Sequence, residues 1–261
     1  MKKVLVPIVL LVVALTTLSF TAGKGVTLRL SPTKGQSYVI NSKTNQTTTM
    51  KIQGRSMSSI QAVESHQTFS TKEVSDNSII FETQIDAIKM SYTTMGMTFN
   101  YDSDNPQNNS PMIADQTQKF DGIIKKPTDV SYDELGRLAV ADDNDMSQLS
   151  NVIIELPEEE LNVGSQWNCV KNQEISDSEV NINMTYTVTN ISKKTVEVSF
   201  TGTIESQDIT GTYSGTATIS AQTGIIMSAS IENKVSTTVS QQELEIPVTI
   251  TGTTTINVKE Q

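Results

Sequence analysis

The stretch Ile182-Asn-Met-Thr-Tyr-Thr-Val188 places an apolar side chain at every second position, with Asn or Thr between them. This period of two is typical of a β-strand with one buried face, because successive side chains of a strand point to opposite sides of the sheet. The pattern recurs, so the second half of the chain is predicted to be an antiparallel meander. Its further apolar positions are Val196, Val198, Phe200 and Ile204; Ile209, Tyr213, Ala217 and Ile219; Ile225, Met227, Ala229, Ile231, Val235 and Val239; and Leu244, Ile246, Val248, Ile250, Ile256 and Val258.

Proline and glycine add detail to these strands. Pro247 cannot donate a ladder hydrogen bond, so the final strand is predicted to be an edge or to carry a bulge. Gly211 and Gly215 flank Tyr213, and glycine at such positions permits bending or lets an aromatic ring lie across the strand.

The first half shows a similar but less regular alternation, in Val26–Leu30, in Ile79–Ile85 and in Met95–Tyr101. The polar stretch Asp102–Pro111 is predicted to be an exposed loop. One helix is expected, because Met146, Leu149, Ile153 and Leu156 follow helical spacing between a possible cap at Asp145 and Pro157. We therefore predict an all-β, mainly antiparallel fold of one or two curved half-barrel modules with one short connecting helix.

An internal duplication is a further hypothesis. Gly35-Gln-Ser-Tyr38 resembles Gly164-Ser-Gln-Trp167, since an aromatic residue follows three positions after glycine at a predicted strand entry. The turns that contain Gly136 and Gly224 also resemble each other, in the same order. The expected organisation is a β module at 24–141, a helical linker at 142–157 and a second β module at 158–261.

Residues 1–23 have the plan of a secretory signal peptide. Lys2 and Lys3 precede an apolar run from Val4 to Leu15, and small residues follow up to Gly23. That run is shorter than the ~20 residues of a membrane span. We expect cleavage without lipidation and a soluble periplasmic or extracellular protein, with no transmembrane segment after signal cleavage.

Charge and residue types exclude several functions. The chain has 19 basic and 29 acidic residues and a net charge of −10, which disfavours binding to nucleic acid. His66 is the sole histidine and Cys169 the sole cysteine, too few for a zinc site. Asp142–Asp145 does not fit a calcium loop in either register that starts with aspartate. Trp167 and Cys169 are interpreted as core residues, and no catalytic residues, metal or cofactor are predicted.

The stripe of Met95, Met97, Phe99 and Tyr101 is the one candidate for ligand binding. Methionine and aromatic side chains form adaptable apolar surfaces, which on a curved sheet could line a groove for a lipid or acyl chain. The alternative is ordinary core packing, which is the more frequent role of such residues.

The Leu156-Pro…Val163-Gly164-Ser-Gln-Trp167 stretch, with the Leu28-x-Leu30…Gly35-x-x-Tyr38 opening, resembles an uncharacterised family of exported bacterial β-rich proteins. That resemblance implies no activity and no catalytic residues. A more distant architectural similarity is to the half-barrels of periplasmic lipoprotein carriers, in which a curved antiparallel sheet wraps an apolar groove.

Two functions follow as hypotheses. The first is a non-enzymatic, exported binding or carrier protein of the bacterial envelope, with a lipid or other apolar ligand. The second is a structural or interaction module of the envelope, whose exposed edge at Leu244–Val258 recruits a protein partner. An enzyme ranks third, because the sequence offers no recognisable catalytic set.

Overall fold

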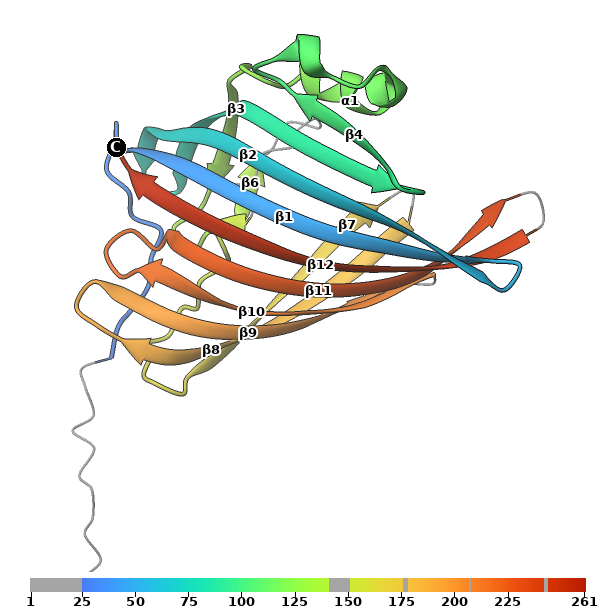
Figure 1. The fold of residues 1–261 in the computed structure, drawn as a ribbon. Coiled ribbons are helices and arrows are strands. Elements are labelled where there is room, and N and C mark those ends of the chain that lie inside the picture. The colour runs from blue at the N-terminus through green and yellow to red at the C-terminus, as the bar shows by residue number, and fades with distance from the viewer. Residues whose placement is uncertain (1–24, 141–150, 176–177, 207, 242–243) are drawn as a thin grey trace, which may run out of the picture.

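The computed structural model describes residues 25–140, 151–175, 178–206, 208–241 and 244–261, and these form one curved antiparallel sheet (Figure 1). Its strand order is β6-β5-β3-β2-β1-β12-β11-β10-β9-β8-β7, and β4 pairs with β3. The all-β prediction is confirmed. The strands are β1 Ser37–Ile52, β2 Arg55–Ser75, β3 Ser78–Thr94, β4 Met97–Asp102, β5 Thr128–Tyr132, β6 Leu138–Val140, β7 Gln166–Ile175, β8 Ser178–Ile191, β9 Thr195–Glu205, β10 Ile209–Ser220, β11 Ile226–Gln241 and β12 Leu244–Glu260.

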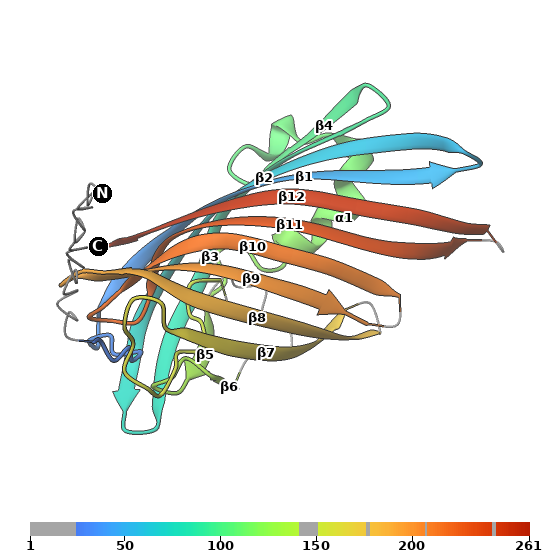
Figure 2. The ribbon, with the colours of Figure 1, turned by 90° about the horizontal axis from the view of Figure 1, so that it is seen from below.

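The first and last long strands join the two halves of the sheet. β1 pairs with β12 from Tyr38↔Glu260 to Met50↔Val248, so the chain returns to its starting strand (Figure 2). The meander predicted for the second half is present, because β7 to β12 follow one another as antiparallel neighbours. Both predicted β modules therefore contribute to a single sheet, and the boundaries at 24–141 and 158–261 stay a prediction.

Pro247 lies in a strand that is central along most of its length. From Val248 onward, β12 has β1 on one side and β11 on the other, so the expected exposed edge at Leu244–Val258 is wrong there. The ladder with β1 ends at Val248, the residue that follows Pro247. The missing amide of Pro247 thus falls where the β1 ladder has already stopped, and residues 244–247 pair only with β11.

The main core covers one end of the concave face, which we call the inner face. Its aromatic side chains come from neighbouring strands in each half: Tyr38 stacks on Phe69 with ring centroids 4.8 Å apart, and Trp167 stacks on Tyr186 at 4.9 Å. Phe200 lies beside Tyr186 at 5.6 Å and passes over Gly215, where a Cβ would come within 2.5 Å of its ring. The prediction that glycine admits an aromatic ring across this strand is therefore confirmed.

Two segments that lie outside the named strands close this core from the open side of the sheet. We call residues 26–31 the first strap and residues 152–161 the second strap. Their buried side chains include Leu28, Ile153 and Leu156, each at most 2% exposed. The straps also bond to each other, because the amide of Val26 donates to the carbonyl of Leu161 and the reverse bond forms as well, at 2.9 and 2.8 Å.

Each strap bonds to a turn of the opposite half. The Ser31 amide donates to the Thr223 carbonyl at 3.1 Å, and the Leu156 amide donates to the Leu135 carbonyl at 2.8 Å. Thr223 and Leu135 each precede the glycine of their turn. This reciprocal arrangement supports the hypothesis of an internal duplication, which stays a prediction.

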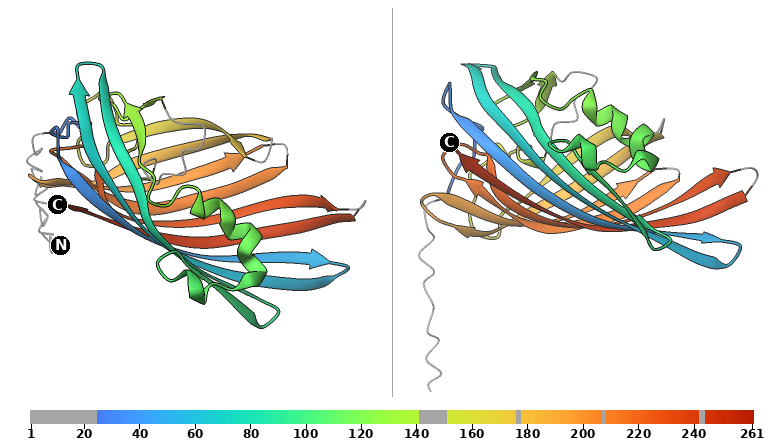
Figure 3. Two further views of the ribbon diagram at one scale, coloured as in Figure 1. Left: turned by 90° about the horizontal axis from the view of Figure 1, so that it is seen from above. Right: turned by 45° about the horizontal axis from the view of Figure 1, so that its top comes forward.

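A small helical cap covers the far end of β3 and β4 on the inner face (Figure 3). The chain after β4 contains two 3₁₀ turns, Pro106–Asn108 and Pro111–Ile113, and then helix α1, Ala114–Asp121. None of the residues of the expected exposed loop at Asp102–Pro111 is buried. Beyond this loop, Ile113 is 3% exposed and packs with Ile88, Met90 and Tyr101, because this end of the sheet needs an apolar cover.

Two local expectations differ from the structure. The predicted helix falls largely on residues 141–150, which lie outside the described residues, and residues 152–157 form a turn followed by irregular chain. Their backbone bonds to other segments, such as Ile226 to Val152, in place of helical partners. Met227 has no register partner in β10, because the β10–β11 register shifts there. Ile226 is paired with Ile219 instead. Among the described residues, no helix is long and apolar enough to cross a membrane.

Candidate functional site

The Met95–Tyr101 stripe divides into a buried end and an exposed end. Tyr101 is 3% exposed, packs against Phe120 and donates its hydroxyl to Asp121 at 3.0 Å. Burial, with the Asp121 carboxylate beside it, raises the pKa of Tyr101 to about 12. Phe99 packs against the same cluster, whereas Met97 is 51% exposed and Met95 is 71% exposed in the β3–β4 turn. Core packing thus accounts for Tyr101 and Phe99, and ligand binding by the stripe stays a prediction.

A second apolar surface lies on the inner face, beyond the main core. Its residues occupy alternate positions along β8 to β12, and the strand register brings them next to each other. They belong to neither of the two hydrophobic clusters of the described core. We call this surface the apolar patch: Ile182, Ile204, Ile209, Val235, Val239, Ile246, Val248 and Ile250. Ile204, Ile246 and Val248 are buried, Ile182, Ile209, Val235 and Ile250 keep part of their surface exposed, and Val239 is 49% exposed. Apolar surface left outside a core is a common mark of a binding site.

A line of polar side chains separates the main core from the apolar patch. Gln46 pairs with Gly252, Gly252 with Asn233, and Asn233 with Tyr213, so the three side chains cross four adjacent strands at one level. We call Gln46, Asn233 and Tyr213 the polar row. Gly252 makes space within it, because a Cβ there would lie 2.6 Å from the Asn233 Oδ1 atom. Burial raises the pKa of Tyr213 above its usual value, so its hydroxyl stays neutral at physiological pH.

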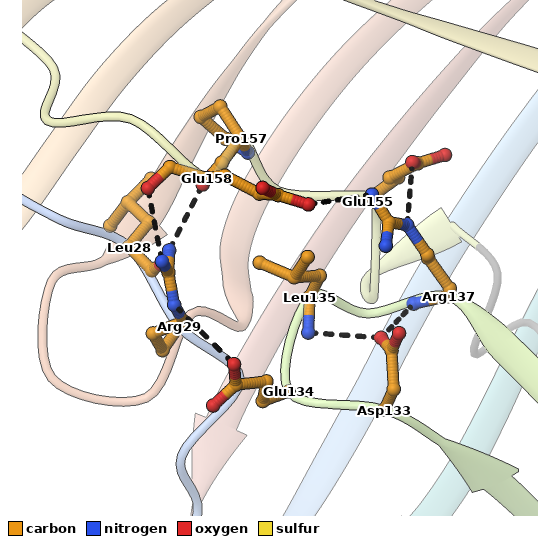
Figure 4. A network of polar contacts seen from close by, with 9 residues as sticks. All are labelled: Leu28, Arg29, Asp133, Glu134, Leu135, Arg137, Glu155, Pro157 and Glu158. Carbon is orange, nitrogen blue, oxygen red and sulfur yellow. Dashed lines mark hydrogen bonds and ion pairs between the residues drawn. The ribbon is translucent and has the colours of Figure 1, made fainter. Parts of the chain in front are cut away.

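A network of charged side chains holds the two straps and one turn together (Figure 4). Arg29 donates to the carbonyls of Leu28, Pro157 and Glu158 at 2.7 to 3.0 Å, and so bridges both straps. Arg137 donates to the Glu155 carboxylate at 2.9 Å, which raises the pKa of the guanidinium further. A cleft of about 490 Å³ adjoins this network, lined in part by Glu158, Glu160 and Trp167. Every arginine contact here is structural, and the glutamates at 158–160 are exposed.

The remaining candidates for catalysis or metal binding, His66 and Cys169, do not lie together in one site. His66 lies on the outer side of β2 and contacts Asn41 Oδ1 at 2.5 Å. Cys169 is 2% exposed and donates its thiol to the Glu155 carbonyl at 3.3 Å, and the Trp167 indole donates to the same oxygen at 3.0 Å. The interpretation of both as core residues is confirmed. Within the described part of the chain, no group of three histidine, cysteine or acidic residues could hold a metal ion, and Asp142–Asp145 lies outside it.

Comparison with protein families gives a match to part of the chain. Residues 139–226, about a third of the chain, are similar to a family of unknown function, DUF6263. This partial match agrees with the resemblance to an uncharacterised family. No curated protein matches the chain.

Solved structures share the architecture at low sequence identity. Lipovitellin, in a structure titled for its lipid–protein interactions, is 12% identical with a TM-score of 0.52. The match covers 88% of this chain and 26% of that one, so this chain spans about a quarter of the length of lipovitellin. That likeness shows a common fold.

Two further structures are similar at a lower level. The translocator domain of the autotransporter NalP from Neisseria meningitidis has 9% identity and a TM-score of 0.36, covering 86% of this chain and 90% of that one. A putative outer membrane lipoprotein-sorting protein domain from Vibrio parahaemolyticus has 10% identity and a TM-score of 0.16, covering 85% of each chain. The analogy to lipoprotein carriers therefore remains an architectural expectation.

Proposed function

We propose that this protein is a non-enzymatic binding or carrier protein that holds an apolar ligand on the inner face of its sheet. The observation that carries the proposal is the apolar patch, which lies outside both hydrophobic clusters and keeps Val239 half exposed. Such a surface in water is unfavourable by about 25 cal/mol per Å², and a ligand that covers it recovers this free energy.

The fold and the expected export are consistent with this role. Lipovitellin, which has the same type of curved sheet, is described by its lipid–protein interactions. The signal peptide expected at residues 1–23 would place the protein in the bacterial envelope or outside the cell, where lipids need carriers to cross water. Its residues lie outside the described part of the chain.

Binding of an uncharged apolar fluorophore, N-phenyl-naphthylamine, tests the proposal. We expect saturable binding to the delipidated protein and an affinity at least about tenfold lower in Val239→Asp and Ile250→Asp, because a carboxylate beside an apolar ligand loses its hydration. Thr251→Asp is the matched control, since Thr251 is exposed on the outer face of β12, the strand that carries Ile250. Absence of binding to the wild-type protein, or equal binding by folded Val239→Asp and Ile250→Asp, would overturn the proposal.

An interaction module of the envelope is the second candidate. The exposed Met95 and Met97 at the β3–β4 turn favour it, because exposed methionines are frequent on surfaces that dock protein partners. Site-specific crosslinking from Met95 in cells would support this candidate if it captured one defined protein, and would argue against it if it captured none.

A further inference from the structure

The inner face is uncharged over a wide area. Among the described side chains, the charged residues at inner positions of β1, β2 and β8 to β12 lie at the ends of strands: Arg55 is exposed beside the β1–β2 turn, and Glu260 is exposed at the end of β12. Every inner position between these ends, glycine apart, carries either an apolar side chain or an uncharged polar side chain. They are the inner residues of β1 from Ile40 to Met50, of β2 from Met57 to Thr71, of β8 from Val180 to Val188, of β9 and β10, of β11 from Ile226 to Val239, and of β12 from Ile246 to Val258.

The charges of this acidic chain lie on the outer side of the same strands. Lys43 pairs with Glu64 at 2.7 Å, Lys72 with Asp129 at 2.7 Å and Lys89 with Asp102 at 3.2 Å. A ligand on the inner face thus meets no cation between the rims of the described sheet to neutralise an anionic group. An isolated carboxylate or phosphate that leaves water without such a partner loses several kcal/mol.

The polar row offers hydrogen bonds in place of charge. In the described part of the chain, the side chains of Gln46, Asn233 and Tyr213 make no hydrogen bond, and Thr48 beside them is likewise unbonded. Their neighbours are already satisfied: Ser42 bonds to Ser65 at 2.8 Å, and Thr44 to Thr254 at 2.9 Å. Two amides and a neutral phenol can both donate and accept, which suits hydroxyl and ester carbonyl groups.

We infer that the ligand is an uncharged amphiphile of the acylglycerol class. This inference rests on the proposed function. The glycerol hydroxyls and ester carbonyl bond to the polar row, and the acyl chain lies along the apolar patch toward the β11–β12 hairpin. The register supports this orientation, because Ile250, Val235 and Ile204 form the level next to the polar row on the side away from the aromatic core.

Competition against N-phenyl-naphthylamine tests the effect of ligand charge while the acyl chain stays the same. Monoolein and oleate carry the same acyl chain, but oleate is anionic at pH 8. We expect monoolein to displace the fluorophore at a concentration at least about tenfold lower than oleate. The double variant Gln46→Leu/Asn233→Leu should lose about tenfold in monoolein affinity and keep its fluorophore affinity. Asn45→Leu/Lys234→Leu, on the outer face of the same two strands, is the matched control and should behave as the wild type.

The outcomes distinguish this inference from the proposed function. If the fluorophore binds but oleate competes as well as monoolein, the uncharged amphiphile is overturned while the carrier function stands. If monoolein is preferred and the double variant binds it like the wild type, the polar row is not its recognition site and that assignment is overturned. If the wild-type protein binds no fluorophore, the proposed function itself fails.

Discussion

Gly136 and Gly224 occupy equivalent places in the two turns that the straps contact. Both have positive φ, +74° and +71°. A Cβ at Gly136 would lie 2.3 Å from the Ile154 carbonyl oxygen, and one at Gly224 would lie 2.4 Å from the Arg29 carbonyl oxygen. Only glycine therefore lets each turn approach the strap beside it, which explains why the two turns look alike in sequence.

Alanine at either turn tests this close approach. We expect Gly136→Ala and Gly224→Ala each to lower the free energy of unfolding by more than about 2 kcal/mol, because steric overlap adds to backbone strain. Gly35→Ala is the control: its φ is +84° but no atom lies within 4 Å, so the strain alone should cost about 1 kcal/mol. Urea unfolding measures all three, and equal losses at Gly35 and Gly136 would contradict the account.

Strand β4 shows that one stripe of alternating residues can have a buried end and an exposed end. Met97, Phe99 and Tyr101 alternate as the sequence predicts, but the helical cap covers only the end near Tyr101. The sequence contains no strong helical signal at 114–121, and the need for a cover arises only when β3 and β4 have paired. Alternation was therefore predictable and burial was not.

Substitution along β4 separates the two environments. Tyr101→Ala should lower the free energy of unfolding by about 3 to 5 kcal/mol, because a buried aromatic ring and its bond to Asp121 are lost. Met97→Ala should change it by less than about 0.5 kcal/mol, since the side chain is half exposed. Thermal or urea unfolding gives both values, and a large loss at Met97 would mean that the turn packs against more than the cap.

The molecule as a whole depends on register that a single sequence does not reveal. Tyr213 and Asn233 are paired by the β10–β11 hairpin, and Gln46 joins their level only because β1 pairs with β12. The one available signal was the interruption of apolar alternation by Asn233 in an otherwise apolar run. The all-β class, most inner positions and the matching glycine turns could be predicted. The closure of the two halves into one sheet, the straps and the polar row required the structure.

Binding of an uncharged amphiphile on the inner face is tested by photocrosslinking with a monoacylglycerol that bears a diazirine in its acyl chain, followed by peptide mass spectrometry. We expect labels on inner residues such as Ile204, Val235 and Ile250, and their loss when unlabelled monoolein is added. Labels confined to outer residues such as Thr203, Lys234 and Thr251, or labelling that monoolein does not reduce, would contradict it.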